Sequence, residues 1–297
     1  MSAPLRVGAV IITMGNRPEE LKALLDSVAR QEGDPVEVVV VGQGVELTGL
    51  VDPAPGVRTV ELPENLGIPG GRNVGIEAFG PAGRDVDVLL FLDDDGLLER
   101  TDTAELCRRA FAEDPHLGII SFRIADPDTG ATQRRHVPRL RASDPLRSSR
   151  VTTFLGGANA VRTKVFEEVG ALPAEFFYAH EETDLAWRAL DAGWLIDYRA
   201  DMVLLHPTTA PSRHAVYHRM VARNRVWLAR RNLPAPLVPV YVGVWLLLTL
   251  LRKPSAPALK AWFGGFKEGW TTPCGPRRPM RWRTVWRLTR LGRPPVI

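Results

Sequence analysis

The sequence predicts an α/β fold with a largely parallel β-sheet covered on both faces by helices, followed by a helical C-terminal region. Up to residue 95, continuous apolar runs alternate with segments whose apolar residues recur at helical spacing, a pattern typical of a doubly wound sheet. Beyond residue 210 the composition becomes basic and tryptophan-rich around one long uncharged segment. We therefore expect an α/β domain over residues 1–210 and a separate helical region over residues 211–297.

Four apolar runs predict the strands of the sheet. They are Val7–Thr13, Val36–Gly42, the short Val57–Pro63 and Val86–Asp95. Continuous apolar runs, unlike alternating ones, are typical of strands that are buried on both faces. In sheets of this kind, ligands lie at the carboxyl ends of the strands.

Two helices are predicted between these strands. Residues 16–30 have Pro18 in the first turn, where proline is favoured, and leucines at helical spacing. Residues 67–80 read as a glycine-rich turn that opens a second helix. This alternation of strand and helix favours parallel strands, because each helix carries the chain back to the start of the next strand.

The middle of the chain is predicted to add one strand and two helices. Val151–Val161 indicates a strand with a glycine step, and residues 163–172 indicate a short helix. Residues 181–194 favour a stronger helix with one apolar face, formed by Leu185, Ala186, Ala189 and Leu190. Three acidic residues gather at the start of that helix, where the helix dipole favours negative charge.

Charge is divided unevenly along the chain. The net charge is +4, but the residues from Met202 onward carry 17 Lys and Arg against one acid, Glu268, for a net +16. The first 201 residues carry 21 basic and 33 acidic residues, for a net −12. An acidic body with a basic C-terminal third indicates two surfaces with different partners. A solvated basic tail is the alternative.

The C-terminal third indicates contact with an anionic membrane surface. Residues 216–232 predict a basic amphipathic helix, and no charge lies between Arg231 and Arg252. Regular helix from near Pro239 would extend only about 18–20 Å, too short to cross a hydrocarbon core of about 30 Å. Basic residues interleaved with tryptophans are typical of interfacial contact. An apolar helix packed on the core or in a homo-oligomer interface is the alternative.

The cysteines and the N-terminus indicate a cytoplasmic protein. Cys107 and Cys274 are the only cysteines and lack the spacing of a metal site, which favours a reducing compartment without disulfides. The apolar run near the N-terminus has about seven residues and fits a core strand better than a signal peptide. Together with the basic third, this predicts peripheral association with the inner face of the cell membrane.

Three consecutive aspartates end the fourth apolar run, in the segment LLFLDDDG (Leu89–Gly96). Like charges this close repel each other, so a positive charge is expected to face them. Clustered carboxylates at a strand end are hard-oxygen ligands for a divalent cation, which could neutralise the diphosphate of a nucleotide. An acidic turn or helix start is the alternative interpretation.

Six motifs follow one another over roughly residues 7–206. They are VIITMGNRPEELKALLDSV, ENLGIPGGRNVGI, FLDDDG, FLGGANAVRTKVFEEVGALPAEFF, HEETDLAWRALDAGW and VLLHP. In this order they resemble glycosyltransferase family 2, the inverting nucleotide-sugar enzymes of the GT-A fold. The resemblance implies that residues 1–210 form a GT-A catalytic domain with a Rossmann-like nucleotide-binding sheet flanked by helices.

The resemblance assigns the acidic cluster to the donor and its metal. Asp93 matches the first aspartate of the family's Asp-x-Asp motif, which contacts the ribose, and Asp94 lies between the two motif positions on the donor side. Asp95 matches the second aspartate, which binds Mg²⁺ or Mn²⁺. His206 matches a further metal ligand, a role that a neutral imidazole can fill.

The resemblance places further donor contacts at the ends of the first two strands and in the glycine-rich segment. Arg72 is placed to contact the donor, since a guanidinium suits phosphate oxygens. Thr13 and Arg17 follow the first strand, where the nucleotide is expected. The second strand departs from the family, because Gly42 and Gln43 replace an aspartate and an asparagine. Gln43 is therefore expected to contact the donor differently, and uridine is not implied.

The resemblance places catalysis at the start of the helix over residues 181–194. Glu182 aligns with the catalytic aspartate, which takes a proton from the acceptor hydroxyl. Glutamate in place of aspartate is a departure, and it leaves Glu181 as the alternative base. Gly156, Gly157 and Asp184 fall in the family's acceptor-side segments. Simple capping of the helix dipole is the alternative role for the acidic cluster.

The function implied is metal-dependent transfer of a sugar, with inversion, to a hydroxyl of a glycan or polyprenyl-linked acceptor. The C-terminal region resembles those of actinobacterial cell-wall rhamnosyl- and galactofuranosyltransferases. A nucleotidyltransferase is the enzymatic alternative, because it also pairs a nucleotide with metal-binding acids. A nucleic-acid-binding module that uses the basic tail is the other alternative, but the acidic body argues against a nucleic-acid partner.

Overall fold

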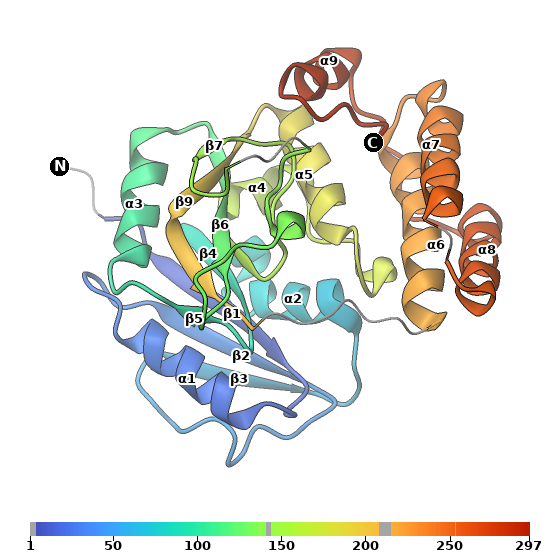
Figure 1. Ribbon diagram of the computed structural model, residues 1–297. Helices are drawn as coiled ribbons and strands as arrows, with labels where there is room; N and C mark the ends of the chain where they lie inside the picture. Colours follow the sequence, from blue (N-terminus) through green and yellow to red (C-terminus); the bar gives the residue numbers. More distant parts are fainter. Residues whose placement is uncertain (1–3, 141–143, 208–214, 253) are drawn as a thin grey trace.

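The computed structural model describes residues 4–140, 144–207, 215–252 and 254–297 (Figure 1). Within these residues the strands form one nine-stranded sheet in the order β3-β2-β1-β4-β8-β6-β9-β5, and β7 pairs with β9. The strands are β1 (Val7–Thr13), β2 (Glu37–Gln43), β3 (Val57–Leu62), β4 (Val88–Asp93), β5 (Leu97–Leu98), β6 (Leu117–Ala125), β7 (Ser149–Arg150), β8 (Ala158–Arg162) and β9 (Leu195–Leu205). The helices are α1 (Pro18–Ala29), α2 (Gly67–Glu77), α3 (Thr103–Glu113), α4 (Thr163–Val169), α5 (Glu181–Ala192), α6 (Ala215–Asn232), α7 (Leu237–Leu251), α8 (Ala256–Thr271) and α9 (Trp282–Arg290).

The first four strands confirm the predicted parallel arrangement. β1 pairs in parallel with both β2 and β4, with Thr13 opposite Gly42 and Ile12 opposite Asp93. The carboxyl ends of β1, β2 and β4 therefore meet at one edge of the sheet. The second half is mixed, because β8 runs antiparallel to its neighbours β4 and β6, whereas β6 and β9 are parallel.

Helices cover both faces of the sheet, as the sequence predicts. On one face, Leu24 of α1 and Phe111 of α3 join a buried cluster with Val40 of β2. On the other face, Ile76 of α2 and Leu190 of α5 join a second cluster. Figure 1 shows α1 and α3 on the opposite side of the sheet from α5.

Two segments differ from their predicted structure. The strand expected over Val151–Val161 is regular only from Ala158 onward, as β8. Before it the chain turns, so that the carbonyl of Gly157 accepts a hydrogen bond from the amide of Asp93 at 3.0 Å. The glycine-rich segment does not precede α2 but forms its first turn. Gly67 there has φ +75°, and a Cβ would lie 2.3 Å from the carbonyl oxygen of Phe177, so only glycine fits.

The C-terminal helices extend the core on the α5 side. Figure 1 shows α6, α7 and α8 side by side, with α9 beyond α5. Trp227, Tyr241 and Leu288, from α6, α7 and α9, are buried in the same cluster as Phe176 and Leu190. The predicted boundary at residue 210 lies outside the described residues.

The apolar helix α7 begins slightly earlier than predicted. It runs over Leu237–Leu251, with 15 residues, or roughly 22 Å at 1.5 Å per residue. Among the described residues, no helix combines the length and hydropathy needed to cross a membrane. Leu247, Leu250 and Leu251 at its end are exposed.

Candidate active site

A cleft of about 430 Å³ lies at the carboxyl ends of β1, β2 and β4. The residues that line it come from the ends of these strands, from the start of α2, from the segment before α5 and from the end of β9. They include Thr13, Arg17, Gln43, Gly67, Asp93, Asp94, Asp95, Phe177, Tyr178 and His206. Most of the predicted donor and metal residues therefore meet in one place, although β1 and β9 are far apart in sequence.

Each of the three aspartates faces a different partner. Asp93 accepts a hydrogen bond from Arg72 Nη2 at 3.1 Å. Asp94 Oδ2 accepts one from Thr13 Oγ1 at 2.6 Å. Arg72 and Thr13 thereby stabilise the charges of two neighbouring carboxylates, and Arg17 Nη1 also lies 3.7 Å from Asp94 Oδ1.

Asp95 is the aspartate with the most positive charge close to it. His206 Nε2 lies 3.0 Å from its Oδ1, and Arg17 Nη1 pairs with its Oδ2. Burial acts to raise the pKa of Asp95, but the hydrogen bond and charge of His206, together with Arg17, outweigh burial and hold that pKa below its usual value. The hydrogen bond to Asp95 raises the pKa of His206. This carboxylate is therefore kept ionised, as a cation site requires.

The residues around Asp95 suit a metal that also binds the substrate. Asp95 Oδ1 and His206 Nε2, an oxygen and a nitrogen of the kinds that can coordinate a divalent metal, lie 3.0 Å apart. No set of three or more His, Cys, Asp or Glu side chains able to hold a metal ion occurs among the described residues. Two protein ligands are what a magnesium-type ion uses when substrate phosphates complete its coordination, so the fit is to a shared site.

Arg72 links the acidic cluster to α5. The side chain is buried, with Nη2 on Asp93 and Nη1 3.7 Å from Glu181 Oε1. Gly156 lies against the same guanidinium, and a Cβ on Gly157 would lie 1.8 Å from Asp93 Cγ. The two glycines, predicted on the acceptor side, thus contact Arg72 and Asp93. Gly157 leaves room for the carboxylate of Asp93 because it has no side chain.

The two glutamates at the start of α5 have different surroundings. Glu181 is buried, and its Oε2 has no hydrogen-bond partner among the described residues. Burial, followed by the charge of Glu182, raises the pKa of Glu181 to about 8 despite Arg72. Glu182 is half-buried, and burial also raises its pKa, although Arg72 and Arg293 act in the opposite direction. Carboxyls with raised pKa values suit proton transfer near neutral pH.

The side-chain amide of Gln43 forms hydrogen bonds with the protein backbone. Its Nε2 donates to the carbonyl of Gly67 at 2.8 Å, and its Oε1 accepts from the amide of Leu66 at 3.0 Å. The side chain lines the cleft while it fixes the start of α2.

Asp184, predicted on the acceptor side, does not line the cleft. The side chain is fully buried. Its oxygens accept from Arg188 Nε at 2.8 Å, Arg231 Nε at 2.9 Å and Asn232 Nδ2 at 2.7 Å. Burial without these three donors would strongly disfavour the charge of the carboxylate. Because Arg231 and Asn232 belong to α6, Asp184 joins α5 to α6.

The segment before α5 is strained, a feature that the sequence reading missed. Phe177, Ala179 and His180 have φ of 61°, 69° and 72°, values that non-glycine residues adopt at a cost. Asn224 of α6 is buried, and its Nδ2 lies 2.7–3.0 Å from the carbonyl oxygens of Phe176, Tyr178 and Ala179. An asparagine within a basic helical pattern gives no sequence signal of such a contact.

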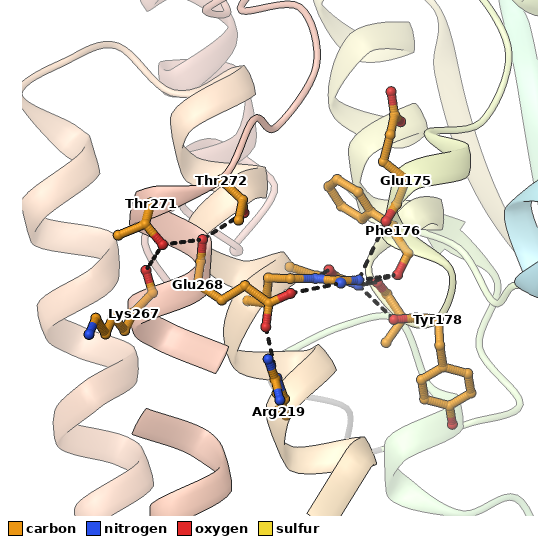
Figure 2. Close-up of polar contacts among 11 residues, drawn as sticks. Glu175, Phe176, Tyr178, Arg219, Lys267, Glu268, Thr271 and Thr272 are labelled. Atoms are coloured by element: carbon orange, nitrogen blue, oxygen red, sulfur yellow. Dashed lines mark hydrogen bonds and ion pairs between the residues drawn. The ribbon is translucent and has the colours of Figure 1, made fainter. Parts of the chain in front are cut away.

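A charged network on α6 and α8 supports the same segment (Figure 2). Arg223 Nη2 donates to the carbonyl of Phe176 at 3.0 Å, and its Nη1 pairs with Glu268 at 3.3 Å. Arg219 pairs with the other oxygen of Glu268 at 2.8 Å. The single acid of the basic third thus aligns two arginines of α6, one of which reaches the strained segment.

The mixed sheet, its flanking helices and the acidic strand end in the cleft are those of the GT-A fold of glycosyltransferases. Residues 9–170, more than half of the chain, match the family described as Glycosyl transferase family 2. The chain belongs to glycosyltransferase family 2. No curated protein matches its sequence.

Solved structures share the fold at low sequence identity. TarS of S. aureus is 19% identical with a TM-score of 0.52, over 75% of this chain and 40% of TarS. GalNAc-T7 with UDP, GalNAc and Mn²⁺ is 13% identical with a TM-score of 0.64, over 82% of this chain and 50% of that one. The mannosyltransferase PcManGT of Pyrobaculum calidifontis, with GDP-Man and Mn²⁺, is 17% identical with a TM-score of 0.55, over 98% of this chain and 85% of that one. The match thus spans less than half of full TarS.

Proposed function

We propose that this protein transfers a sugar, with inversion and in a metal-dependent reaction, from a nucleotide-sugar donor to a hydroxyl of a glycan or lipid-linked acceptor. The observation that carries the proposal is the convergence of the three aspartates, His206, Arg17 and Arg72 at the carboxyl ends of β1 and β4. Release of a nucleoside diphosphate from a nucleotide-sugar, dependent on a divalent metal, tests it. Pyrophosphate as the product would instead indicate a nucleotidyltransferase.

The donor is proposed to lie along the acidic edge of the cleft. Arg17 and Arg72 supply guanidiniums for phosphate oxygens, and Asp93 and Asp94 supply acceptors for ribose or sugar hydroxyls. Thr13 and Gln43 hold Asp94 and the start of α2 in place. The UDP in the GalNAc-T7 structure and the GDP-Man in the PcManGT structure support a nucleotide-sugar donor, but they leave the base open.

Asp95 and His206 are proposed to hold the divalent cation, Mn²⁺ or Mg²⁺. The Mn²⁺ in the GalNAc-T7 and PcManGT structures supports such a cofactor. When bound, the cation supplies positive charge that stabilises the departing diphosphate. A cation that balances the charge of Asp95 would leave the adjacent guanidinium of Arg17 free to pair with the diphosphate as well.

The base is proposed to be Glu182, with Glu181 as the alternative. The base takes the proton of the acceptor hydroxyl, whose oxygen bonds to the anomeric carbon while the bond from that carbon to the nucleoside diphosphate breaks. Glu182, at the start of α5, is more exposed than Glu181. Glu181 is buried against Arg72 and faces the donor side.

The two predicted parts of the chain are proposed to share the work. Residues 1–210 form the catalytic domain, with the donor and metal residues. Residues 211–297 form a helical region that supports the segment before α5 through Asn224 and Arg223, and that presents an apolar and basic surface. We propose that this surface holds the enzyme peripherally on the inner face of the cell membrane, where cell-envelope glycans are extended.

The proposed membrane surface lies on α7, α8 and α9. Its exposed apolar residues are Leu247, Leu250, Leu251, Phe263, Trp270, Trp282 and Trp286. In α9, Arg283, Arg287 and Arg290 alternate with tryptophans. Tryptophans beside basic residues favour the interface of an anionic bilayer. The same surface in a homo-oligomer would be apolar but would not respond to lipid charge.

Replacing Trp282 and Trp286 together by alanine is expected to weaken binding to phosphatidylglycerol vesicles about tenfold or more. Both side chains are at least half exposed, so the free energy of unfolding is expected to stay close to that of the parent. Co-sedimentation with vesicles at low and high salt measures the effect. The control is Leu146→Ala, which changes an exposed apolar residue outside the proposed membrane surface. A parent protein that stays free of the vesicles at low salt would contradict the proposal.

Asn224→Ala is expected to destabilise the fold by about 1–3 kcal/mol, because the carbonyls of Tyr178 and Ala179 lose their side-chain donor and that of Phe176 is left with Arg223. It is also expected to lower kcat, since that segment presents the base. Urea unfolding and turnover measure the two effects. Arg219→Ala is the matched control, because it removes a contact of the same helix with Glu268 but none with the segment. If Asn224→Ala had the kcat and the stability of the parent, the segment before α5 would keep its conformation without Asn224, and the prediction would be wrong.

A further inference from the structure

A small cavity of about 60 Å³ lies between the start of α5, the helices α6 and α7, and the C-terminal residues. It is separate from the donor cleft. Its polar lining includes His180, Thr183, Arg225, Tyr241 and Arg293, and its apolar lining includes Trp187 and Trp245. Two arginines in so small a space concentrate positive charge.

Neither arginine of the cavity forms an ion pair with an acid among the described residues. Arg225 lies over the ring of Trp245, 3.3 Å from its centroid, and shares a hydrogen bond with Tyr241. Arg293 interacts only at longer range with Tyr241 and Glu182. Burial lowers the pKa of both guanidiniums, but arginine stays charged in proteins. Two half-buried guanidiniums that share one small cavity, with no ion pair among the described residues, favour the binding of an anion there.

His180 adds an unused polar atom to the same cavity. Its Nε2 is buried and has no hydrogen-bond partner among the described residues. Burial, followed by the charges of Arg225 and Arg293, lowers its pKa well below the usual value, so the imidazole is neutral and can donate from one nitrogen. Its backbone has φ of 72°, and strain of this kind is retained where the surroundings require it.

The cavity lies between the proposed base and the apolar surface. His180 and Thr183 flank Glu181 and Glu182 in the chain, and Arg293 acts on the charge of Glu182. On the other side, Tyr241 and Trp245 belong to α7, whose far end carries the exposed Leu247, Leu250 and Leu251. A ligand with an anionic group in this cavity could therefore extend a hydroxyl toward the base and an apolar chain toward α7.

We propose that this cavity binds the phosphate of a lipid-linked acceptor. The inference rests on the proposed function and adds the acceptor's chemistry to it: a phosphate ester joined to an apolar chain. Arg225 and Arg293 pair with the phosphate oxygens, and His180 donates a further hydrogen bond. The phosphate thereby fixes the distance between the acceptor sugar and Glu182.

The test is titration of the full chain with dodecyl phosphate in uncharged dodecyl maltoside micelles, with a chelator present. Without a metal, the three aspartates of the donor cleft disfavour anions. The parent is expected to bind dodecyl phosphate, and Arg293→Gln and Arg225→Gln are expected to bind it about tenfold or more weakly, as for loss of a charge-assisted hydrogen bond. Arg30→Gln, an exposed arginine that directly follows α1, is the matched control and should bind as the parent does.

Further arms separate the sources of phosphate. Inorganic phosphate that binds as tightly as dodecyl phosphate would overturn the assignment to a lipid-linked acceptor. So would loss of binding to phosphatidylglycerol vesicles in Arg293→Gln, because the cavity would then take bilayer headgroups. Arg225→Lys keeps the charge and is expected to retain most of the binding, which distinguishes lost charge from lost fold. Parental binding of dodecyl phosphate by Arg293→Gln would also overturn the proposal.

Donor turnover by the parent, measured as nucleoside diphosphate release without acceptor, runs in parallel. If turnover is present and dodecyl phosphate binding does not depend on Arg293, the cavity assignment fails alone. If turnover is absent while Arg293-dependent binding is present, the sugar-transfer proposal fails and the anion site stands.

Discussion

Asp95→Ala is expected to abolish metal-dependent binding of the nucleotide-sugar and to lower turnover on the order of 10³-fold or more, as for loss of the group that stabilises developing negative charge. Asp95 is the acid on which His206 and Arg17 converge. Its removal takes away one proposed ligand of the cation and leaves the other without its partner. Calorimetric titration of the donor, with Mn²⁺ and with a chelator, measures the binding.

Two matched variants serve as comparisons for Asp95→Ala. His206→Ala removes the second proposed ligand and is expected to weaken metal affinity less severely. Asp94→Asn keeps an acceptor for the Thr13 hydroxyl and is expected to retain metal-dependent binding. If Asp95→Ala turned over the donor normally in the presence of a chelator, the acidic cluster would have no metal role.

Glu182→Gln is expected to lower kcat by about 10²–10⁴, the usual cost of losing a general base, and to leave donor affinity almost unchanged. Glutamine keeps the shape and much of the hydrogen bonding of the side chain but cannot take a proton. The half-buried side chain interacts with the donor residue Arg72 only through its charge. Single-turnover rates with saturating donor, together with donor titration, separate the two effects.

Glu181→Gln is the control from the same helix start, and the structure predicts a different pattern for it. Glu181 Oε1 lies 3.7 Å from Arg72, so its loss is expected to weaken donor binding. Inactive Glu181→Gln with active Glu182→Gln would move the base by one residue. If both variants were active, the acidic residues would serve only the helix dipole.

The raised pKa of Glu181 also predicts a pH dependence of stability. Its carboxyl holds a proton up to about pH 8 in the folded protein, against a usual pKa of 4.5. The folded state therefore binds more protons than the unfolded state between these values, and stability is expected to fall as pH rises through this range. In Glu181→Gln this part of the fall should disappear in urea unfolding curves at pH 5 and pH 8.

The strands and helices of the first 95 residues could be predicted because their signals are local. The apolar run Val7–Thr13 and the leucines of α1 need no knowledge of distant residues to indicate strand and helix. The aspartate cluster could be placed at a ligand edge for the same reason, since parallel strands carry their ends to one side.

The partners of those aspartates could not be predicted from pattern alone. Thr13 and Asp94 are 81 residues apart, and only the parallel pairing of β1 with β4 brings them together. The surroundings of Asp184 could not be predicted either, because Arg231 and Asn232, which enclose it, are 47 and 48 residues away. Asn224 was overlooked because a backbone acceptor leaves no mark in the sequence.

The central claim is that the cleft uses a divalent metal to release a nucleoside diphosphate from a nucleotide-sugar. The most direct measurement is a screen of UDP-, GDP- and dTDP-sugars with Mn²⁺, Mg²⁺ or chelator, in which the released nucleotide is identified. We predict release of the nucleoside diphosphate from at least one donor, its loss in chelator, and its loss in Asp95→Ala. Pyrophosphate as the released product, or release that persists in chelator and in Asp95→Ala, would contradict the account.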